Sequence, residues 1–258
     1  MYPTLFQIGS FRIDTYSVMW FIALALAIVW AIHRLALYDL DEDESRRVMA
    51  VSFFFMLLGA RMPEYVRHFS DYAANPSLLL DLNRGGMEEY GAILGAFISA
   101  MIMCAFSRKV SFLKLCEVAA IPAMLAITIG RWGCFLNGCC VGLPTDFFLH
   151  VHFPRDAEGL FRHPVQIYYS VIAGCIVLFL MWVERKVLPK QKKHFQPVIA
   201  PLALILYSLM RLAIIPVREG FSLSEIFTSY WGYMAILASI PLECLWLAYG
   251  LRKLKAQN

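Results

Sequence analysis

Residues 16–37 read YSVMWFIALALAIVWAIHRLAL, an apolar run that decides the class of fold. A bilayer core of about 30 Å takes about 20 helical residues to cross, and this run has that length. The whole chain agrees, because 60% of its residues are hydrophobic, 16% are charged and the mean hydropathy is +0.61. Soluble domains are about 45–50% apolar and about 25% charged. No small-residue cleavage site follows the run, so we expect a membrane span and not a removed signal peptide.

Six further apolar stretches are long enough, or nearly long enough, to cross a bilayer. They run from about 48 to 66, 90 to 106, 112 to 130, 165 to 183, 198 to 217 and 231 to 251. Backbone in lipid must satisfy its own hydrogen bonds, which long runs without strand-like alternation do as helices. We therefore expect an all-α, polytopic membrane protein with seven transmembrane helices, forming a single transmembrane domain over residues 1–258.

The basic residues set the expected orientation, because loops rich in Lys and Arg stay on the cytoplasmic side. They gather after the first, third and fifth stretches and at the C-terminus, for example at Arg46, Lys109, Lys192 and Lys253. This places the N-terminus outside and the C-terminus in the cytoplasm, and it indicates membrane topology and not binding to nucleic acid. An outer-side loop is expected at about 131–164, and loops of that length are often functional.

Three arginines are expected at membrane depth in the outer half of the bilayer. Arg61 and Arg211 lie inside apolar stretches, and Arg131 closes the fourth stretch. A charge at that depth costs at least about 2.5 kcal/mol, so it usually faces a cavity and has a partner. One interpretation pairs each arginine with a carboxylate such as Glu64 or lets it snorkel to the surface. The other is a cationic cavity, completed by Arg218, for an anionic phospholipid head, because planar guanidinium groups suit phosphate.

The most distinctive stretch is Gly130–Gly142, GRWGCFLNGCCVG, in which four glycines follow a predicted helix end and permit close backbone approach. It resembles the signature Gly-Arg-x-Gly-Asn-Phe-x-Asn-Gly-Glu of the bacterial prolipoprotein diacylglyceryl transferase family. The resemblance covers almost the whole chain in order and spacing. The further matches are Phe6–Gly9 with Tyr16, Gly59–Arg61, Arg84–Met87 with Tyr90–Ala92, Arg162–Tyr168, and Tyr207 with Arg211 and Arg218.

The resemblance implies an enzyme of the bacterial cytoplasmic (inner) membrane. Members of this family transfer the diacylglyceryl group of phosphatidylglycerol to the lipobox cysteine thiol of a prolipoprotein. The product is a thioether, glycerol phosphate is released, and no cofactor or metal is expected. The partners implied are therefore phosphatidylglycerol, the prolipoprotein signal peptide with its lipobox cysteine, and the lipid bilayer.

The resemblance also implies roles for individual residues. Arg131, Arg211 and Arg218 would hold the phosphate, with Arg61 supporting the cavity. Hydrogen bonds from Asn137 and Tyr16 would orient reacting groups. The remaining residues implied for substrate binding or catalysis are Gly85, Gly86, Tyr90, Cys139 and His163. For His163, which precedes Pro164 at a helix start, a structural role is favoured over that of a general base.

Three polar positions depart from the family's motifs. Tyr90 stands where the family has histidine, Cys134 where it has asparagine, and Cys139 where it has glutamate. A tyrosine, with an ordinary pKa near 10, is a poorer base than histidine unless nearby arginines lower that pKa. These departures leave two alternatives open, a transferase with a different thiol acceptor and a non-catalytic phospholipid-binding or transport protein.

The cysteines of the signature are expected on the oxidising outer side of the membrane. Arginines nearby would lower the pKa of Cys139, which could then attack the lipid directly. A disulfide from Cys134 to Cys139 or Cys140 is a second interpretation, and it would suit a membrane thiol–disulfide protein. A third interpretation is a zinc site that these cysteines form with His150, His152 or His163, although no ligand spacing supports it strongly. The other cysteines are expected to pack as small hydrophobes: Cys104, Cys116, Cys175 and Cys244.

Overall fold

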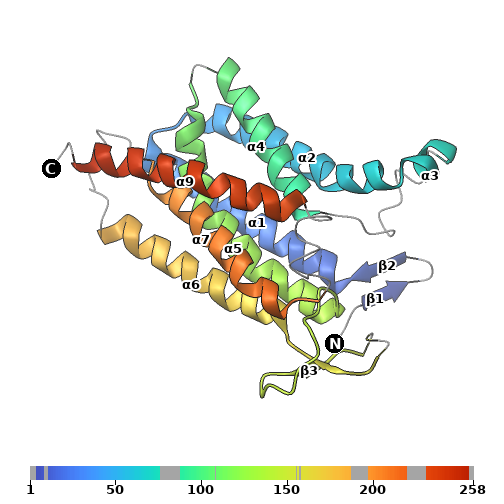
Figure 1. The fold of residues 1–258 in the computed structure, drawn as a ribbon. Coiled ribbons are helices and arrows are strands. Elements are labelled where there is room, and N and C mark those ends of the chain that lie inside the picture. Colours follow the sequence, from blue (N-terminus) through green and yellow to red (C-terminus); the bar gives the residue numbers. More distant parts are fainter. Residues whose placement is uncertain are drawn as a thin grey trace. The chain divides into compact units, whose positions relative to one another are not determined.

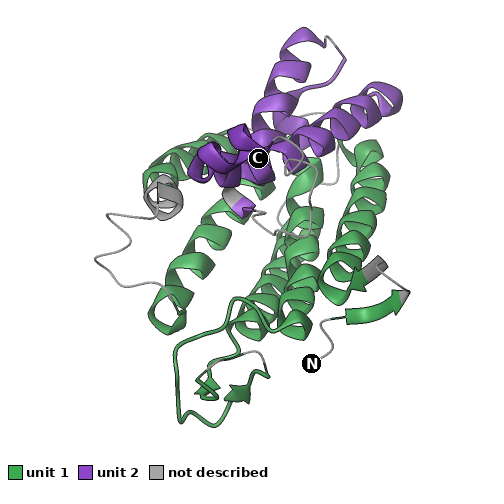
Figure 2. Ribbon diagram, turned by 90° about the vertical axis from the view of Figure 1, so that its right-hand side faces the viewer, with its two compact units in different colours: residues 1–38, 116–258 green, residues 39–115 purple. Residues whose placement is uncertain are grey.

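The computed structural model describes residues 4–8, 11–75, 88–107, 109–154, 156, 158–186, 197–219 and 231–255. It is mostly helical, which confirms the predicted class. The chain forms two compact units, Met1–Tyr38 with Cys116–Asn258 and, between them in sequence, Asp39–Leu115 (Figure 2).

The first unit is a bundle of helices that carries two short hairpins (Figure 1). Its long helices are α1 (Thr15–Leu35), most of α5 (Phe112–Asn137), α6 (Val165–Lys186), α7 (Ile199–Ile214) and α9 (Trp231–Lys255). Single 3-10 turns, η1 (Ala36–Tyr38) and η4 (Ile215–Val217), continue α1 and α7. The antiparallel hairpins pair β1 (Thr4–Ile8) with β2 (Phe11–Asp14), and β3 (Val151–His152) with β4 (Phe161–Arg162).

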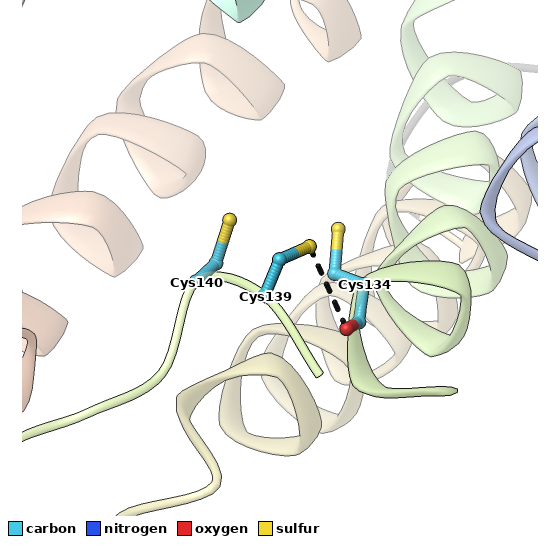
Figure 3. A group of neighbouring side chains, drawn as sticks. All are labelled: Cys134, Cys139 and Cys140. Carbon is cyan, nitrogen blue, oxygen red and sulfur yellow. Dashed lines mark hydrogen bonds between the residues drawn. The ribbon is translucent and has the colours of Figure 1, made fainter. Parts of the chain in front are cut away.

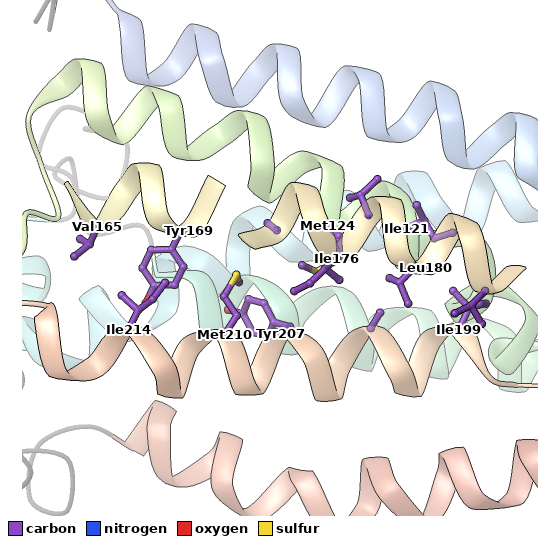
Figure 4. Close-up of a cluster of buried hydrophobic side chains, with 14 residues drawn as sticks. Ile121, Met124, Val165, Tyr169, Ile176, Leu180, Ile199, Tyr207, Met210 and Ile214 are labelled. Atoms are coloured by element: carbon purple, nitrogen blue, oxygen red, sulfur yellow. The ribbon is translucent and has the colours of Figure 1, made fainter. Parts of the chain in front are cut away.

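The core of this unit lies between α5, α6 and α7 (Figure 4). Buried side chains from all three helices meet along their length, from Leu180 and Ile199 at one end to Tyr169 and Ile214 at the other. Small residues bring α1 against α5 in the same way, because Ala23 and Ala27 pack on Ala126. The bundle thereby fixes both ends of α5, α6 and α7.

One end of the bundle is held by buried ionic groups. The carboxylate of Glu117, at the start of α5, accepts hydrogen bonds from the backbone N–H groups of Ile199 (2.9 Å) and Ala200 (2.8 Å). It thus caps the N-terminus of α7, where backbone N–H groups lack helical partners. Nearby, the buried guanidinium group of Arg34 donates two hydrogen bonds of 2.7 Å to the carboxylate of Glu184 and others to the carbonyl oxygens of Glu117 and Val118.

The second unit pairs two helices through glycines. It contains α2 (Glu42–Arg67), α3 (Phe69–Ala74) and α4 (Glu89–Phe106). A Cβ atom on Gly95 would lie 2.2 Å from the carbonyl oxygen of Phe55, and one on Gly59 would lie 2.2 Å from that of Gly91. Gly91 and Gly95 form a small-xxx-small pattern, which lets the backbones of membrane helices approach closely.

Five helices are long and apolar enough to cross a membrane among the described residues: α1 with η1, α2, α5, α6 and α7 with η4. Their exposed side chains include Phe21, 75% exposed, and Leu178, 69% exposed, as suits contact with lipid. The structure has a helix at each of the seven predicted stretches, and the apolar part of α4 is shorter, Gly91–Phe106. A count of seven transmembrane helices remains a prediction.

Candidate functional site

The signature stretch begins inside α5, which corrects the expected start of the outer loop. The loop was predicted from Arg131, but the helix continues to Asn137. The physical reason is that the first two glycines serve helix packing and not a turn. A Cβ atom on Gly130 would lie 2.8 Å from the ring of Trp20, and one on Gly133 would lie 2.9 Å from Cβ of Met19. Arg131 is therefore held on a helix packed against α1.

The third glycine ends the helix. The backbone N–H of Cys139 donates to the carbonyl oxygen of Cys134 (3.1 Å), and that of Gly138 donates to Phe135 (3.1 Å). This pair of bonds, with Gly138 at a φ of 74°, is a Schellman motif, in which a left-handed glycine reverses the chain after the last helical turn. The reversal folds Cys139 back over Cys134.

Three cysteine side chains converge at this turn (Figure 3). The sulfur atoms of Cys134, Cys139 and Cys140 all lie within 4.8 Å of one another. They are free thiols, so the predicted disulfide is not formed in this structure. Cys134 is buried and Cys140 is exposed, and Cys140 has a φ of 58°, which is uncommon for a residue with a side chain.

The surroundings of Cys139 and Cys140, the two cysteines that follow α5, shift their pKa values in opposite directions. Hydrogen bonds from the thiols of Cys134 and Cys139, together with the positive charges of Arg218 and Arg131, hold the pKa of Cys140 well below its ordinary value. The thiol of Cys134 also lowers the pKa of Cys139, but Cys140 and burial raise it more, so on balance that pKa is raised. Of the two, Cys140 is therefore the more acidic.

Two of the predicted arginines meet on one aromatic ring. The guanidinium carbon of Arg131 lies 4.4 Å from the ring centroid of Tyr169, and that of Arg211 lies 5.5 Å from the same centroid. Both arginines are buried, with 6% and 3% of their surface exposed. A ring beneath a guanidinium group attracts its charge and orients it without using any of its N–H donors. α5, α6 and α7 thus bring together two cations from distant parts of the sequence.

The segment after the cysteines joins the ends of three helices. The backbone N–H of Gly142 donates to His163 (3.0 Å), before α6, and that of Leu143 donates to Val217 (2.9 Å), after α7. Gly142 also forms an isolated β-bridge with Arg218. No larger residue fits at position 142, because its Cβ atom would lie 2.6 Å from the carbonyl oxygen of His163. This network of backbone hydrogen bonds sets the position of the Arg218 backbone.

The Arg162–Tyr168 stretch serves mainly to hold this loop. Arg162 is buried and forms ion pairs with Asp156 (2.7 Å), Glu158 (2.6 Å) and Glu219 (2.7 Å). His163 shares a hydrogen bond of 3.1 Å between its Nδ1 atom and the hydroxyl group of Tyr168. These contacts agree with a structural role for His163.

The other predicted site residues fall in three places. Asn137, at the end of α5, donates a hydrogen bond to the sulfur of Cys139, and the backbone of Tyr16 lies against Gly133. Arg61 belongs to the second unit, where it is a buried residue of α2 with its guanidinium carbon 5.7 Å from the ring centroid of Tyr65. Gly85 and Gly86 lie outside the described residues, as does the side chain of Tyr90.

An apolar groove lies between the loop that joins α5 to α6 and α6 itself. Its volume is about 460 Å³, and its walls are almost entirely hydrocarbon. The lining includes Phe148 and Val151 from the loop and Ile167, Val171 and Ile172 from α6.

Sequence reasoning missed two residues of the site. Tyr169, the platform for both arginines, directly follows the tyrosine that carries the resemblance. Gln166, whose side-chain amide donates to the carbonyl oxygen of Cys139 (2.6 Å), was noted as part of a motif but given no role. A signal was present, because Gln166 and Tyr169 are three residues apart and so share one face of α6.

Comparison with known proteins identifies the family of the chain. The sequence model of the prolipoprotein diacylglyceryl transferase family matches residues 3–250. A phosphatidylglycerol–prolipoprotein diacylglyceryl transferase of Clostridium novyi (strain NT) is 32% identical over 217 residues, which cover 82% of this chain and 82% of the relative. The enzyme of the same name from Clostridium tetani (strain Massachusetts / E88) is 31% identical over 189 residues, covering 72% and 75%. The chain therefore belongs to the prolipoprotein diacylglyceryl transferase family.

Proposed function

We propose that this protein transfers the diacylglyceryl group of phosphatidylglycerol to the lipobox cysteine of a prolipoprotein, a step of lipoprotein biosynthesis. The observation that carries the proposal is the pair of buried arginines, Arg131 and Arg211, on the face of Tyr169. Guanidinium groups oriented in this way present planar N–H edges, and such edges bind the oxygens of a phosphate diester. Family membership supplies the reaction in which that phosphate takes part.

The reaction divides among the site residues as follows. Arg131 and Arg211, with Arg218 at the loop, stabilise the charge that develops on phosphate as the glycerol phosphate leaves, which is the main task of such donors. Asn137 and Tyr16 orient groups at the end of α5. Cys139 and Tyr90 remain candidates for handling the acceptor thiol, and Arg61, Gly85, Gly86 and His163 remain candidates for substrate binding.

The proposal includes a membrane setting. The protein is a multi-pass membrane protein, and we place it in the bacterial cytoplasmic membrane with the N-terminus outside. In that orientation the end of α5 that carries Arg131 reaches the outer leaflet, and Lys-rich loops face the cytoplasm. The apolar groove beside Phe148 and Val171 then lies at the level of lipid and is suited to an acyl chain.

The direct test is a transfer assay with the full-length protein in nanodiscs. Phosphatidylglycerol with a label in its acyl chains is supplied with a peptide that carries a lipobox cysteine, and the peptide is analysed for a thioether-linked diacylglyceryl group. Arg131→Ala is compared with Arg46→Ala, which removes an exposed arginine from α2. We expect transfer by the wild type and by Arg46→Ala, and its loss in Arg131→Ala.

Two results would overturn the proposal. Binding of phosphatidylglycerol without transfer to any thiol peptide would indicate a lipid-binding or transport protein. Transfer to thiol peptides regardless of the lipobox sequence would indicate a different acceptor.

A further inference from the structure

The cysteine cluster is the group of three metal-ligating side chains that stands out in the part of the chain that the structure describes. Three sulfur atoms from Cys134, Cys139 and Cys140 lie within 4.8 Å of one another. Zinc binds cysteine sulfur at about 2.3 Å, so two ligands of a tetrahedral site lie about 3.8 Å apart. The cluster therefore needs to close by about 1 Å at most. Cys139 and Cys140 follow the end of α5, where small backbone rotations can supply that movement.

We infer that Cys134, Cys139 and Cys140 bind a zinc ion whose fourth position takes the thiol of the acceptor. Zinc sites with three protein ligands and one open position are catalytic, whereas closed sites with four are structural. The exposure of Cys140 beside the buried Cys134 leaves the cluster accessible from one side. The inference that a metal binds depends only on the geometry of the cysteine cluster. The inference that the fourth position takes the acceptor thiol rests on the proposed function.

The charges around the cluster fit this metal. Three thiolates and one Zn²⁺ ion carry a net charge of −1, and a bound acceptor thiolate makes it −2. The positive charges of Arg131 and Arg218 act on the cluster. Arg131 precedes Cys134 by three positions on α5, so the two side chains share one face of the helix. The metal would therefore lie next to a group that we assign to phosphate.

A zinc ion would serve the chemistry of the transfer. A thiol attacks carbon only as thiolate, and a thiol that coordinates zinc is deprotonated on binding. A zinc ion held by the three cysteines would deprotonate the acceptor thiol without a separate general base.

The acceptor thiol binds zinc and releases its proton to water. Its sulfur then forms a bond to the glyceryl carbon of phosphatidylglycerol as the bond from that carbon to the phosphate oxygen breaks. The electron pair stays on that oxygen, and glycerol phosphate leaves beside the arginines. The thioether product carries no charge and is a weak zinc ligand, so it leaves the metal.

Metal binding is tested without any lipid substrate. The purified full-length protein, reduced and stripped of metal, is titrated with Zn²⁺ and separately with Co²⁺, whose absorption bands report thiolate ligands. We expect one ion per chain with sulfur-to-cobalt charge-transfer bands. Cys139→Ser and Cys140→Ser should each lose at least about tenfold in affinity. The control Cys175→Ser, an exposed cysteine on α6, should bind as the wild type does.

The fourth position is tested with the acceptor peptide. We expect the cobalt bands to change when a lipobox peptide is added, and not when its cysteine is replaced by serine. In the transfer assay, removal of zinc should lower the rate about 100-fold, and addition of zinc should restore it.

Several outcomes would overturn the inference. A disulfide among the three cysteines in freshly purified protein, or metal binding that Cys139→Ser and Cys140→Ser leave unchanged, would remove the site. Full transfer by metal-free protein would remove the catalytic role and leave the proposed function intact. Stoichiometric zinc without any transfer would instead contradict the proposed function and support the metal site alone.

Discussion

The two ends of the α5–α6–α7 bundle both bury arginine, but they surround it differently. At one end, Arg34 binds the carboxylate of Glu184 and two backbone carbonyl oxygens. At the other, Arg131 and Arg211 lie over the ring of Tyr169. Carboxylate contacts satisfy N–H donors and compensate charge, whereas an aromatic face orients the plane of the cation. We interpret the first arrangement as one that holds helices together and the second as the phosphate site proposed above.

The strongest test of this difference is Arg131→Ala. We expect the rate of transfer to fall at least about 1,000-fold, because donors to the developing phosphate charge are lost. The fold should persist, since the helix packs through Gly130 and Gly133 and not through this side chain. Transfer kinetics and thermal unfolding in detergent, measured on the same preparation, check both parts.

Arg131→Lys separates the positive charge at this position from the planar geometry of arginine. Lysine keeps the charge but not the planar pair of donors, so we expect it to recover only a small part of the activity. Near-complete recovery would show that charge alone is sufficient at this position.

The reciprocal change at the other end is Arg34→Met. We expect it to lower the free energy of unfolding by about 3 kcal/mol, because it leaves the largely buried carboxylate of Glu184 without its ion pair. Transfer per folded molecule should stay close to that of the wild type. A stable variant that has lost transfer would contradict the assignment of this end to structure.

The aromatic platform is tested by Tyr169→Leu. Two cation–π contacts of about 0.5–2 kcal/mol each are lost, so we expect transfer to fall about tenfold. Tyr169→Phe is the matched control, because it keeps the ring and removes a buried hydroxyl group that makes no hydrogen bond within the described part of the chain. Equal losses in the two variants would assign the effect to the hydroxyl group.

The smallest effect is expected at Glu158→Gln in the loop between α5 and α6. Glu158 is exposed, and Arg162 keeps its ion pairs with Asp156 and Glu219. Exposed ion pairs contribute about 0–1 kcal/mol, so we expect unfolding and transfer to change little. A large loss of transfer would show that this carboxylate acts in the site.

Much of the helical fold could be predicted from hydropathy, because lipid imposes length and composition on each helix. The ends of helices could not be predicted as well. Gly130 and Gly133 looked like turn residues, and only their contacts with Trp20 and Met19 on α1 explain why α5 continues past them. The position at which a helix ends therefore depends on packing partners that are far apart in the sequence.

The candidate site could likewise be predicted only in part from the sequence. The arginines could be predicted because a charge in an apolar stretch is conspicuous. Tyr169 could not, because an aromatic residue in an apolar helix looks like core until its neighbours are known. The cysteines could be identified individually, but their convergence depends on the left-handed turn at Gly138. The sequence alone does not indicate which of the four glycines adopts a positive φ.

The backbone bonds of Gly142 and Leu143 also bear on the order in which the protein becomes active during synthesis. Their partners are His163 and Val217, which leave the ribosome after them, the second only once α7 is complete. A nascent chain that ends after α6 contains Arg131 and all three signature cysteines, but it lacks Arg211, Arg218 and the carbonyl group of Val217 to which Leu143 donates. Activity therefore begins only after α7 has entered the membrane, so a partly inserted chain cannot act on lipid.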